Sequence, residues 1–490
     1  MTKFQTITFT IIAITGAFMA VMDTTIVDII VPKLTGVLST DMYGVQWIIT
    51  AYMLSAAITL LISPYLIHNF GKHKIFLFAL SAFTLASFMC GISNSLGFMI
   101  FSRVIQGIGE ALVMVTAHIM IFSYFPPDKK GVAMGIFALG VAFAPAIGPT
   151  LGGYLVEYFN WRMVFFINVP IGIITILAGT ILLTKDSPTP IKLNFLSFFS
   201  LAISTLSLLV LLSKGQQYGW FKNDYILSLL FIAIIGFLFF IYFELNSDYK
   251  LIKYSLFRNK DFTLGILIYF VVLGFSMYQY FYLLPVFYEH IKGLGSLESG
   301  IGIFGFGVFI GIFSILSGIA SDKVGAKIVI LVGIIIYLID TLYLIPKINY
   351  YTPFMQAVFY TIPFGIAMGM FFAPVTVLVM NTAPNDSEQS TMIMDYARFV
   401  GGSFGTAIAT NNLEWFKNDM FLKINENQNY FYIKNFLDNL PFNSDVAKVV
   451  FGKYELLMAT NYGFYKVFLY AGFFGVIGSI FVFLLFLKKV

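Results

Sequence analysis

Charged residues are scarce in this sequence. Asp, Glu, Lys and Arg make up 11% of its 490 residues, against roughly 25% in soluble globular proteins. Hydrophobic residues make up 59%, and a water-soluble fold could not cover so much apolar surface. The composition therefore favours a protein that lies in a lipid bilayer. The net charge of +5 is spread over short loops rather than gathered in one basic segment, so we expect no nucleic-acid partner.

Cysteine and metal-binding patterns are also nearly absent. Cys90 is the single cysteine, so the chain can form neither an internal disulfide nor a cysteine-based metal cluster. The four histidines show no HExxH spacing, which is the pattern of a helical zinc site. No GxxxxGK[ST] motif occurs either, which disfavours ATP hydrolysis. We expect no metal and no cofactor.

Long hydrophobic runs, by contrast, are abundant. A membrane-spanning helix needs about 20 mostly apolar residues. Fourteen runs of suitable length follow one another along the chain, and they predict an all-α membrane protein. The runs lie near 7–31, 45–66, 75–93, 97–123, 132–156, 162–184, 194–212, 225–245, 262–288, 298–320, 327–346, 352–380, 392–412 and 464–487.

The Lys and Arg residues between the runs indicate orientation, because cytoplasmic loops are enriched in them. With the N-terminus inside, the inner segments hold fifteen Lys and Arg residues and the short outer loops six. We therefore expect both termini in the cytoplasm. The runs group as six, two and six, which predicts an N-terminal bundle (1–184), an inserted two-helix region (185–261) and a C-terminal bundle (262–490). The C-terminal bundle includes a long outer loop, 413–463, in which 430–437 is expected to form a short amphipathic helix.

Several charged residues lie inside the predicted membrane helices. Asp23 and Asp28 lie late in the first run. A carboxylate in a membrane helix is costly and normally faces a cavity or a partner. Both are candidate proton-binding groups, and the alternative for each is a packing role through hydrogen bonds.

The fourth run adds Arg103, Gln106 and Glu110, which share one helical face because they are three and seven residues apart. Arg103 lies roughly 9 Å and Asp23 roughly 12 Å from the outer ends of their helices, so we expect them at similar depth. Glu110 is a candidate for cation recognition or for a second proton site. A static salt bridge to Arg103 or to another helix would explain it equally well.

Asp395 and Arg398 lie three residues apart in the thirteenth run, so they are expected to pair on one helical face. We interpret them, with Gln106 and Glu110, as candidates for the lining of a substrate cavity. Asp340 in the eleventh run is a weaker candidate.

Small residues mark the fifth run, where Gly135, Gly148, Pro149, Gly152 and Gly153 occur. Glycine lets helices approach closely, and proline interrupts the hydrogen-bond ladder. We expect this helix to lie at a moving interface.

Two matching loops follow the second and tenth runs. The first contains Gly71 and Lys72, and the second contains Asp322, Lys323 and Gly325. An Asp at a helix end with a Lys beside it can form a cytoplasmic latch, although positive-inside anchoring would also explain the lysines.

These patterns together resemble the major facilitator superfamily, in particular its fourteen-helix drug:proton antiporters of the EmrB/QacA type. The resemblance rests on residues 22–32, on 103–111, on the glycines of the fifth run and on the two loops. Asp28 stands where the family usually has Asn, and His68 stands where it usually has the Asp of the first loop.

The resemblance implies a major-facilitator fold of two six-helix bundles plus two inserted helices. It also implies a proton-driven exporter of small lipophilic compounds in the inner membrane, with Asp23 and Arg103 in proton transfer. An exporter dedicated to one metabolite, such as a siderophore or lipid-like compound, would show the same motifs. A periplasmic adaptor and an outer-membrane channel are further partners that the family leaves open. A membrane-embedded enzyme or receptor is a remote alternative, because no nucleophile–base set or soluble domain is visible.

Overall fold

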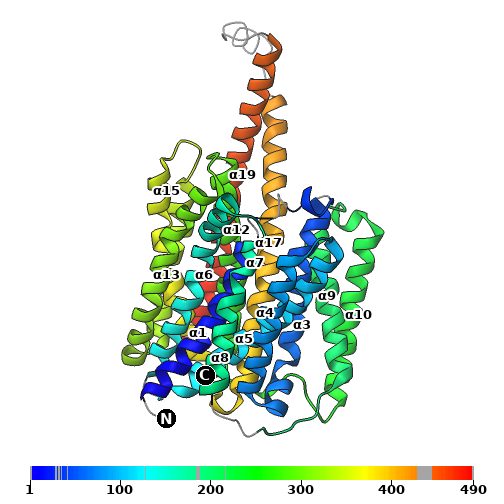
Figure 1. Ribbon diagram of the computed structural model, residues 1–490. Coiled ribbons are helices and arrows are strands. Elements are labelled where there is room, and N and C mark those ends of the chain that lie inside the picture. Colours follow the sequence, from blue (N-terminus) through cyan, green and yellow to red (C-terminus); the bar gives the residue numbers. More distant parts are fainter. Residues whose placement is uncertain are drawn as a thin grey trace.

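A computed structural model describes residues 3–487 apart from 28–29, 31–33, 35, 41, 127–128, 184–187, 216 and 427–443. These residues form helices and no strand (Figure 1). The helices of the first half are α1 (Lys3–Ile26), α3 (Met42–Phe70), α4 (Lys72–Ile92), α5 (Leu96–Tyr124), α6 (Lys130–Tyr158), α7 (Met163–Phe166) and α8 (Asn168–Leu182). A pair of helices follows, α9 (Phe195–Lys214) and α10 (Asp224–Asn246).

The second half contains several interrupted helices. Its elements are α11 (Lys260–Ile268), the π-helical stretch η5 (Tyr269–Ser276), α12 (Met277–His290), α13 (Ser296–Val324), α14 (Ala326–Ile339), the π-helical stretch η6 (Asp340–Leu344), α15 (Phe354–Tyr360), α16 (Ile362–Thr382), α17 (Ser387–Glu426) and α19 (Ser444–Leu484). Each of the fourteen predicted runs coincides with one of these helices or with a consecutive group of them. Twelve helical spans within the described residues are long and apolar enough to cross a membrane. Neither α6 nor α17 is among these twelve.

Helices α6 and α13 pack tightly against each other and join the two halves of the chain. A Cβ atom at Gly135 would lie 2.5 Å from the carbonyl oxygen of Ser314, and one at Gly318 would lie 2.1 Å from that of Gly131. Distances this short allow no side chain, so only glycine lets the two backbones touch. The same helices also meet near their opposite ends, where Gly300 lies against Thr150.

The pair α9 and α10 lies on the opposite flank of the molecule, beside α3 (Figure 1). Helix α9 contacts both halves, because the Ser213 and Thr50 hydroxyls lie 3.3 Å apart and the Thr205 hydroxyl bonds that of Tyr396 in α17. Helix α10 is mostly exposed, and its outward side chains include Phe231, Leu238 and Tyr242. An apolar surface of this kind is suited to lipid rather than to water.

The prediction of a long outer loop at 413–463 is wrong for the described part of that segment. Helix α17 continues to Glu426, and α19 begins at Ser444 and runs on without a break. The ends of the two helices project beyond the rest of the molecule (Figure 1). The extension of α17 is supported by ion pairs at helical spacing, Lys417 with Glu414 and Lys423 with Asp419. The predicted helix at 430–437 lies outside the described residues.

The chain begins and ends at the same end of the molecule, and the projecting helices mark the opposite end (Figure 1). This arrangement is the one expected of an even number of crossings.

Candidate functional site

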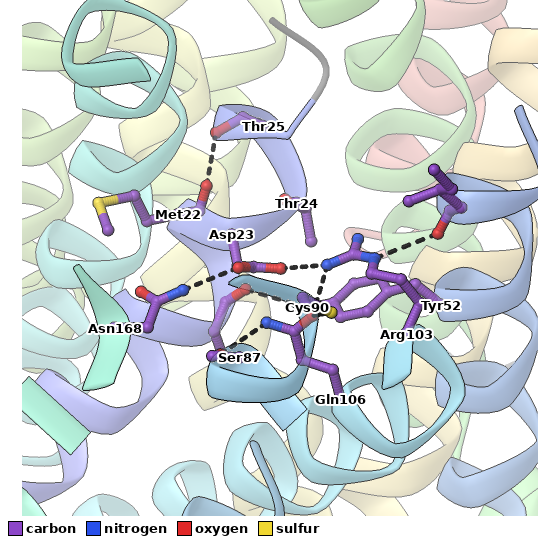
Figure 2. A network of polar contacts seen from close by, with 12 residues as sticks. Met22, Asp23, Thr24, Thr25, Tyr52, Ser87, Cys90, Arg103, Gln106 and Asn168 are labelled. Carbon is purple, nitrogen blue, oxygen red and sulfur yellow. Dashed lines mark hydrogen bonds and ion pairs between the residues drawn. The ribbon is translucent and has the colours of Figure 1, made fainter. Parts of the chain in front are cut away.

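A buried ion pair between Asp23 and Arg103 forms the centre of the first half (Figure 2). Asp23 lies one turn before the end of α1 and is completely buried, and Arg103 of α5 is 1% exposed. The Arg103 guanidinium donates through Nη1 to one carboxylate oxygen of Asp23. The other carboxylate oxygen accepts a 2.8 Å hydrogen bond from the side-chain amide of Asn168, at the start of α8. The sequence predicted Asp23 and Arg103 at similar depth, and the structure brings them into contact.

Further hydrogen bonds tie Arg103 to the surrounding helices. Its Nε donates to the Ile48 carbonyl of α3 at 3.1 Å, and its Nη1 also donates to the Gln106 side-chain oxygen at 2.7 Å. The Gln106 amide in turn donates to the Ser87 hydroxyl of α4 at 2.8 Å. The guanidinium lies over the Tyr52 ring, 3.9 Å from its centroid, which adds a cation–π contact. One network therefore connects α1, α3, α4, α5 and α8 through a single buried charge pair (Figure 2).

The network adjoins the interface helix α6. A Cβ atom at Gly148 would lie 2.3 Å from the Thr25 hydroxyl and 3.3 Å from the Met22 carbonyl oxygen, both within one turn of Asp23. Gly152 and Gly153 are buried in the same helix, and Pro149 lies between them and Gly148. A movement of α1 at Asp23 would therefore press directly on α6.

Glu110 lies on the same face of α5 as Arg103 but is not paired with it. Its side chain is 2% exposed, and its Oε2 has no hydrogen-bond partner. Tyr52 and, from the other half, Arg398 lie within electrostatic reach of its carboxyl group. The salt bridge to Arg103 that sequence reasoning left open is not formed.

A second polar cluster bridges the two halves. Asp395 and Arg398 of α17 form the predicted pair, with Nη2 3.6 Å from Oδ1. The His118 Nδ1 of α5 lies 3.4 Å from the second Asp395 oxygen, and Arg398 donates to the Tyr278 hydroxyl at 3.0 Å. The side chains of Asp395, Arg398 and His118 are buried.

A small cavity of about 10 Å³ lies beside this cluster, between the halves. A space of that size holds about one water molecule. Its walls come from α5, α6, η5, α16 and α17, and the lining residues are Met114, His118, Met134, Phe137, Ala138, Val141, Tyr269, Phe372, Thr376, Asp395 and Arg398. The cavity is thus lined by apolar and aromatic side chains, with a polar cluster at one side.

The end of the molecule that carries the termini is closed by Asp322. This residue, near the end of α13, accepts hydrogen bonds from the backbone N–H groups of Gly131 at 2.8 Å and Val132 at 3.0 Å. Both donors lie in the first turn of α6, where N–H groups are unpaired within the helix and attract negative charge. Asp322 therefore links the two halves through a carboxylate and a helix end. The neighbouring Lys323 is exposed.

The corresponding loop of the first half is built differently. Gly71 and Gly325 start α4 and α14 with φ of 87° and 90°, a backbone conformation that favours glycine. Lys72 donates to the Ser123 hydroxyl at 3.1 Å. In place of an aspartate, His68 lies 3.9 Å from Glu388 in the first turn of α17.

Asp28 lies outside the described residues, and the structure gives no side-chain contacts for Pro149. Asn168, His118 and Tyr278 belong to the two clusters but are not among the predicted site residues. His118 had a sequence signal, because it follows Glu110 and Met114 at four-residue spacing on one face of α5. Asn168 and Tyr278 had none, since their roles depend on helices distant in sequence.

A sequence model of the Major Facilitator Superfamily matches residues 13–406. The uncharacterized MFS-type transporter YhcA of Bacillus subtilis is 30% identical over 402 residues, which cover 82% of this chain and 75% of that protein. The multidrug export protein EmrB of Escherichia coli is 28% identical over 411 residues, covering 83% and 80%. The riboflavin transporter RibZ of Clostridioides difficile is 29% identical over 374 residues, covering 76% and 80%.

Proposed function

Because this chain belongs to the Major Facilitator Superfamily of transporters, we propose that it is a proton-coupled antiporter that exports lipophilic drugs or similar small molecules by alternating access. The observation that carries the proposal is the buried Asp23–Arg103 pair. Ionisable side chains within membrane helices are costly and mark proton and ion pathways. The pair is also the centre of the most extensive buried polar network in the first half.

Proton binding at Asp23 would change the packing of that half. A proton on the Asp23 carboxyl removes its negative charge and with it the electrostatic attraction of Arg103. The guanidinium would then keep only the Ile48 carbonyl and Gln106 oxygens, and the contact between α1 and α5 would loosen. Protonation thereby shifts the balance between two packings of the same helices.

The interface helix α6 would transmit this change to the second half. It touches α1 at Gly148, beside Asp23, and α13 at Gly131 and Gly135. A shift of α1 would move α6 against α13 and strain the contacts of Asp322 with Gly131 and Val132. In this account Asp322 keeps the cytoplasmic side closed until the halves rock apart, and Lys72 and Lys323 anchor the same side to the membrane surface.

For the membrane topology we propose fourteen crossings, with α6 and α17 added to the twelve apolar spans. Both helices lie among the others along most of their length (Figure 1). This arrangement gives six-helix bundles at 1–184 and 262–490, with α9 and α10 of region 185–261 inserted between them. The excess of Lys and Arg in the inner segments supports a cytoplasmic location for both termini. The projecting ends of α17 and α19 would then lie outside the inner membrane.

The substrate would bind in the cavity between the halves after it opens. Drug-sized ligands need pockets of about 300–1,000 Å³, so the cavity would have to widen before such a molecule could bind. Its Met and aromatic walls suit lipophilic molecules, and Asp395 and Arg398 supply charge at one side. Glu110 does not line this cavity, although it lies within electrostatic reach of Arg398. Gln106 belongs to the Asp23 network and does not line this cavity.

A second function is an exporter dedicated to one metabolite. The similarity to a riboflavin transporter favours this alternative. The contacts that Arg398 makes with Asp395 and Tyr278 also favour it, because side chains held in fixed positions could bind one defined polar group of a substrate. In either case the projecting ends of α17 and α19 would be the contact for a periplasmic adaptor and, through it, an outer-membrane channel.

Proton exchange in everted membrane vesicles tests the leading proposal. We expect lipophilic cations or neutral drugs to collapse a preformed pH gradient in vesicles that contain the wild-type protein. Asp23→Asn should reduce this response at least tenfold, because asparagine has the same shape but cannot exchange a proton. The matched control is Asp224→Asn at the exposed start of α10, which should behave like wild type.

The possible outcomes separate the alternatives. A response that survives Asp23→Asn would contradict the assigned role and move the proton site to Glu110. If none of the lipophilic cations and neutral drugs collapsed the pH gradient, but one metabolite such as riboflavin did, the dedicated exporter would be favoured.

A further inference from the structure

The carboxyl group of Asp340 is buried in the second half without a partner. Asp340 is 0% exposed and begins η6, the π-helical stretch that continues α14. Neither carboxyl oxygen has a hydrogen-bond partner, and Asp340 forms no ion pair within the part of the chain that the structure describes. A bare carboxylate in such a place costs several kcal/mol, so the protonated form is favoured in this conformation.

The helix opposite Asp340 is broken at the same level. Helix α15 ends at Tyr360, and α16 restarts at Ile362 with Pro363 in its first turn. The backbone N–H of Phe364, in that turn, faces the Asp340 carboxyl without closing a regular hydrogen bond. The first turn of a helix carries partial positive charge. A small approach of α16 would therefore stabilise the ionised carboxylate as well, so both protonation states are within reach.

Helices α14 and α16 pack on each other in the same way as α4 and α5 in the first half. A Cβ atom at Gly109 of α5 would lie 2.8 Å from the Ala79 carbonyl oxygen, and Gly333 of α14 meets the Ala367 carbonyl oxygen of α16. Gly109 and Ala367 are 258 residues apart, and Ala79 and Gly333 are 254 apart.

A second pair of contacts, between α5 and α3 in the first half and between α16 and α13 in the second, shows the same offsets in residue number. Gly107 lies against the Tyr52 carbonyl oxygen and Gly365 against that of Phe306, each with a Cβ distance of 2.3 Å. The pairs are again 258 and 254 residues apart. These contacts indicate that helix packing in the two halves corresponds at this level.

This correspondence places Asp340 at the level of the Asp23–Arg103 network of the first half. Asp340 matches Ala86, the neighbour of Ser87, and Phe364 matches Gln106. Ser87 and Gln106 are hydrogen-bonded members of the Asp23–Arg103 network. Arg103 itself corresponds to Thr361, at the break between α15 and α16. At this level the second half thus has a buried carboxyl and a helix end, where the first half has an alanine and an arginine.

We propose that Asp340 is a second proton-binding site of the transporter, located in the second half and independent of Arg103. The inference rests on the proposed proton-coupled function and extends it to a second carrier. An O–H bond forms at the Asp340 carboxyl when a proton arrives from water and breaks when the proton returns to water. No other group is oxidised or reduced. Asp340 lies roughly 10 Å from the outer end of its helix, within reach of water once the outer side opens.

Among the described residues, no charged side chain is found beside Asp340. Tyr280 of α12 and Tyr337 of α14 are the titratable groups that face Asp340, and their hydroxyls are engaged with the Phe468 carbonyl and with Ser276. Helix α16 contains no charged residue. Helix α19 contributes Gly472, which lies against the Thr341 backbone.

Infrared spectroscopy of the purified protein tests this site without substrate. Protonated carboxylic acids give a carbonyl stretching band that is separate from that of carboxylates. We expect Asp340→Asn to lose one protonated-acid component at neutral pH, while Asp23→Asn loses none because Asp23 is paired with Arg103. The Asp340 component should also diminish as the pH is raised. A spectrum of Asp340→Asn identical to wild type would overturn the proposal, as would a component that does not titrate.

Proton counting provides the second measurement. Substrate binding to the detergent-solubilised wild type should release more protons than binding to Asp340→Asn, by up to one per protein. Asp340→Glu, which keeps the acid, should restore the release. Equal release from wild type and a folded Asp340→Asn would contradict a transport role for the site. If the wild type releases none, the proposed antiport fails, whereas the infrared titration still decides whether Asp340 binds a proton.

Discussion

Replacement of Arg103 by alanine is expected to destabilise the protein by about 3–5 kcal/mol, the usual cost of removing one partner from a buried ion pair, and to abolish proton-coupled export. The substitution leaves Asp23 completely buried with only the Asn168 amide beside it. It also removes the hydrogen bonds that Arg103 donates to the Ile48 carbonyl of α3 and to the Gln106 side chain. Thermal or denaturant unfolding of the purified protein in detergent measures the change.

A double-mutant cycle separates the charge pair from simple loss of packing. Asp23→Asn together with Arg103→Ala should be more stable than the sum of the two single changes predicts, because the double variant contains no uncompensated charge. Arg103→Lys keeps the charge but not the planar fork, and it should recover part of the stability. Strict additivity of the two single substitutions would contradict a direct Asp23–Arg103 interaction.

Substitution of Gly318 by alanine should have the second largest effect. The added methyl group would lie 2.1 Å from the Gly131 carbonyl oxygen, so α6 and α13 must separate. Overpacking of this kind costs about 1–3 kcal/mol. Because Asp322 binds the first turn of α6 one helical turn away, the separation should also open the side of the molecule that carries the termini. Melting temperature and labelling of cysteines introduced along α6 and α13 measure the two consequences.

Gly452 of α19 provides the matched control for this substitution. It is also a helical glycine, but a Cβ atom there would have no neighbour within 4 Å. Gly452→Ala should therefore raise stability by about 0.5–1 kcal/mol, the gain in helix propensity. If Gly318→Ala proved as harmless as Gly452→Ala, the tight contact between α6 and α13 would be refuted.

The sequence predicted the helices well because each membrane span must satisfy its own backbone and therefore carries its own apolar run. The Asp395–Arg398 pair was also predictable, because both residues lie in one helix at a spacing of three residues. The 413–463 segment was misjudged because its polar composition was interpreted as a loop. Charge pairs such as Lys417 with Glu414 can instead support a helix that extends into water.

Contacts between distant helices were beyond the reach of the sequence. Depth estimates brought Asp23 and Arg103 to one level but could not show that they touch. Asn168, which completes the Asp23 site, is 145 residues away in the chain. Asp340 was only a weak candidate, since its importance depends on the break in α16 and on the match between the two halves.

The central claim is that Asp23 couples substrate movement to protons, and reconstituted proteoliposomes test it most directly. Two assays are compared on the same preparation, namely exchange of labelled substrate at equal pH and accumulation of substrate driven by a pH gradient. Our account predicts that Asp23→Asn retains the exchange, because the substrate cavity lies elsewhere, and loses the gradient-driven accumulation. Accumulation by Asp23→Asn at the wild-type level would contradict it.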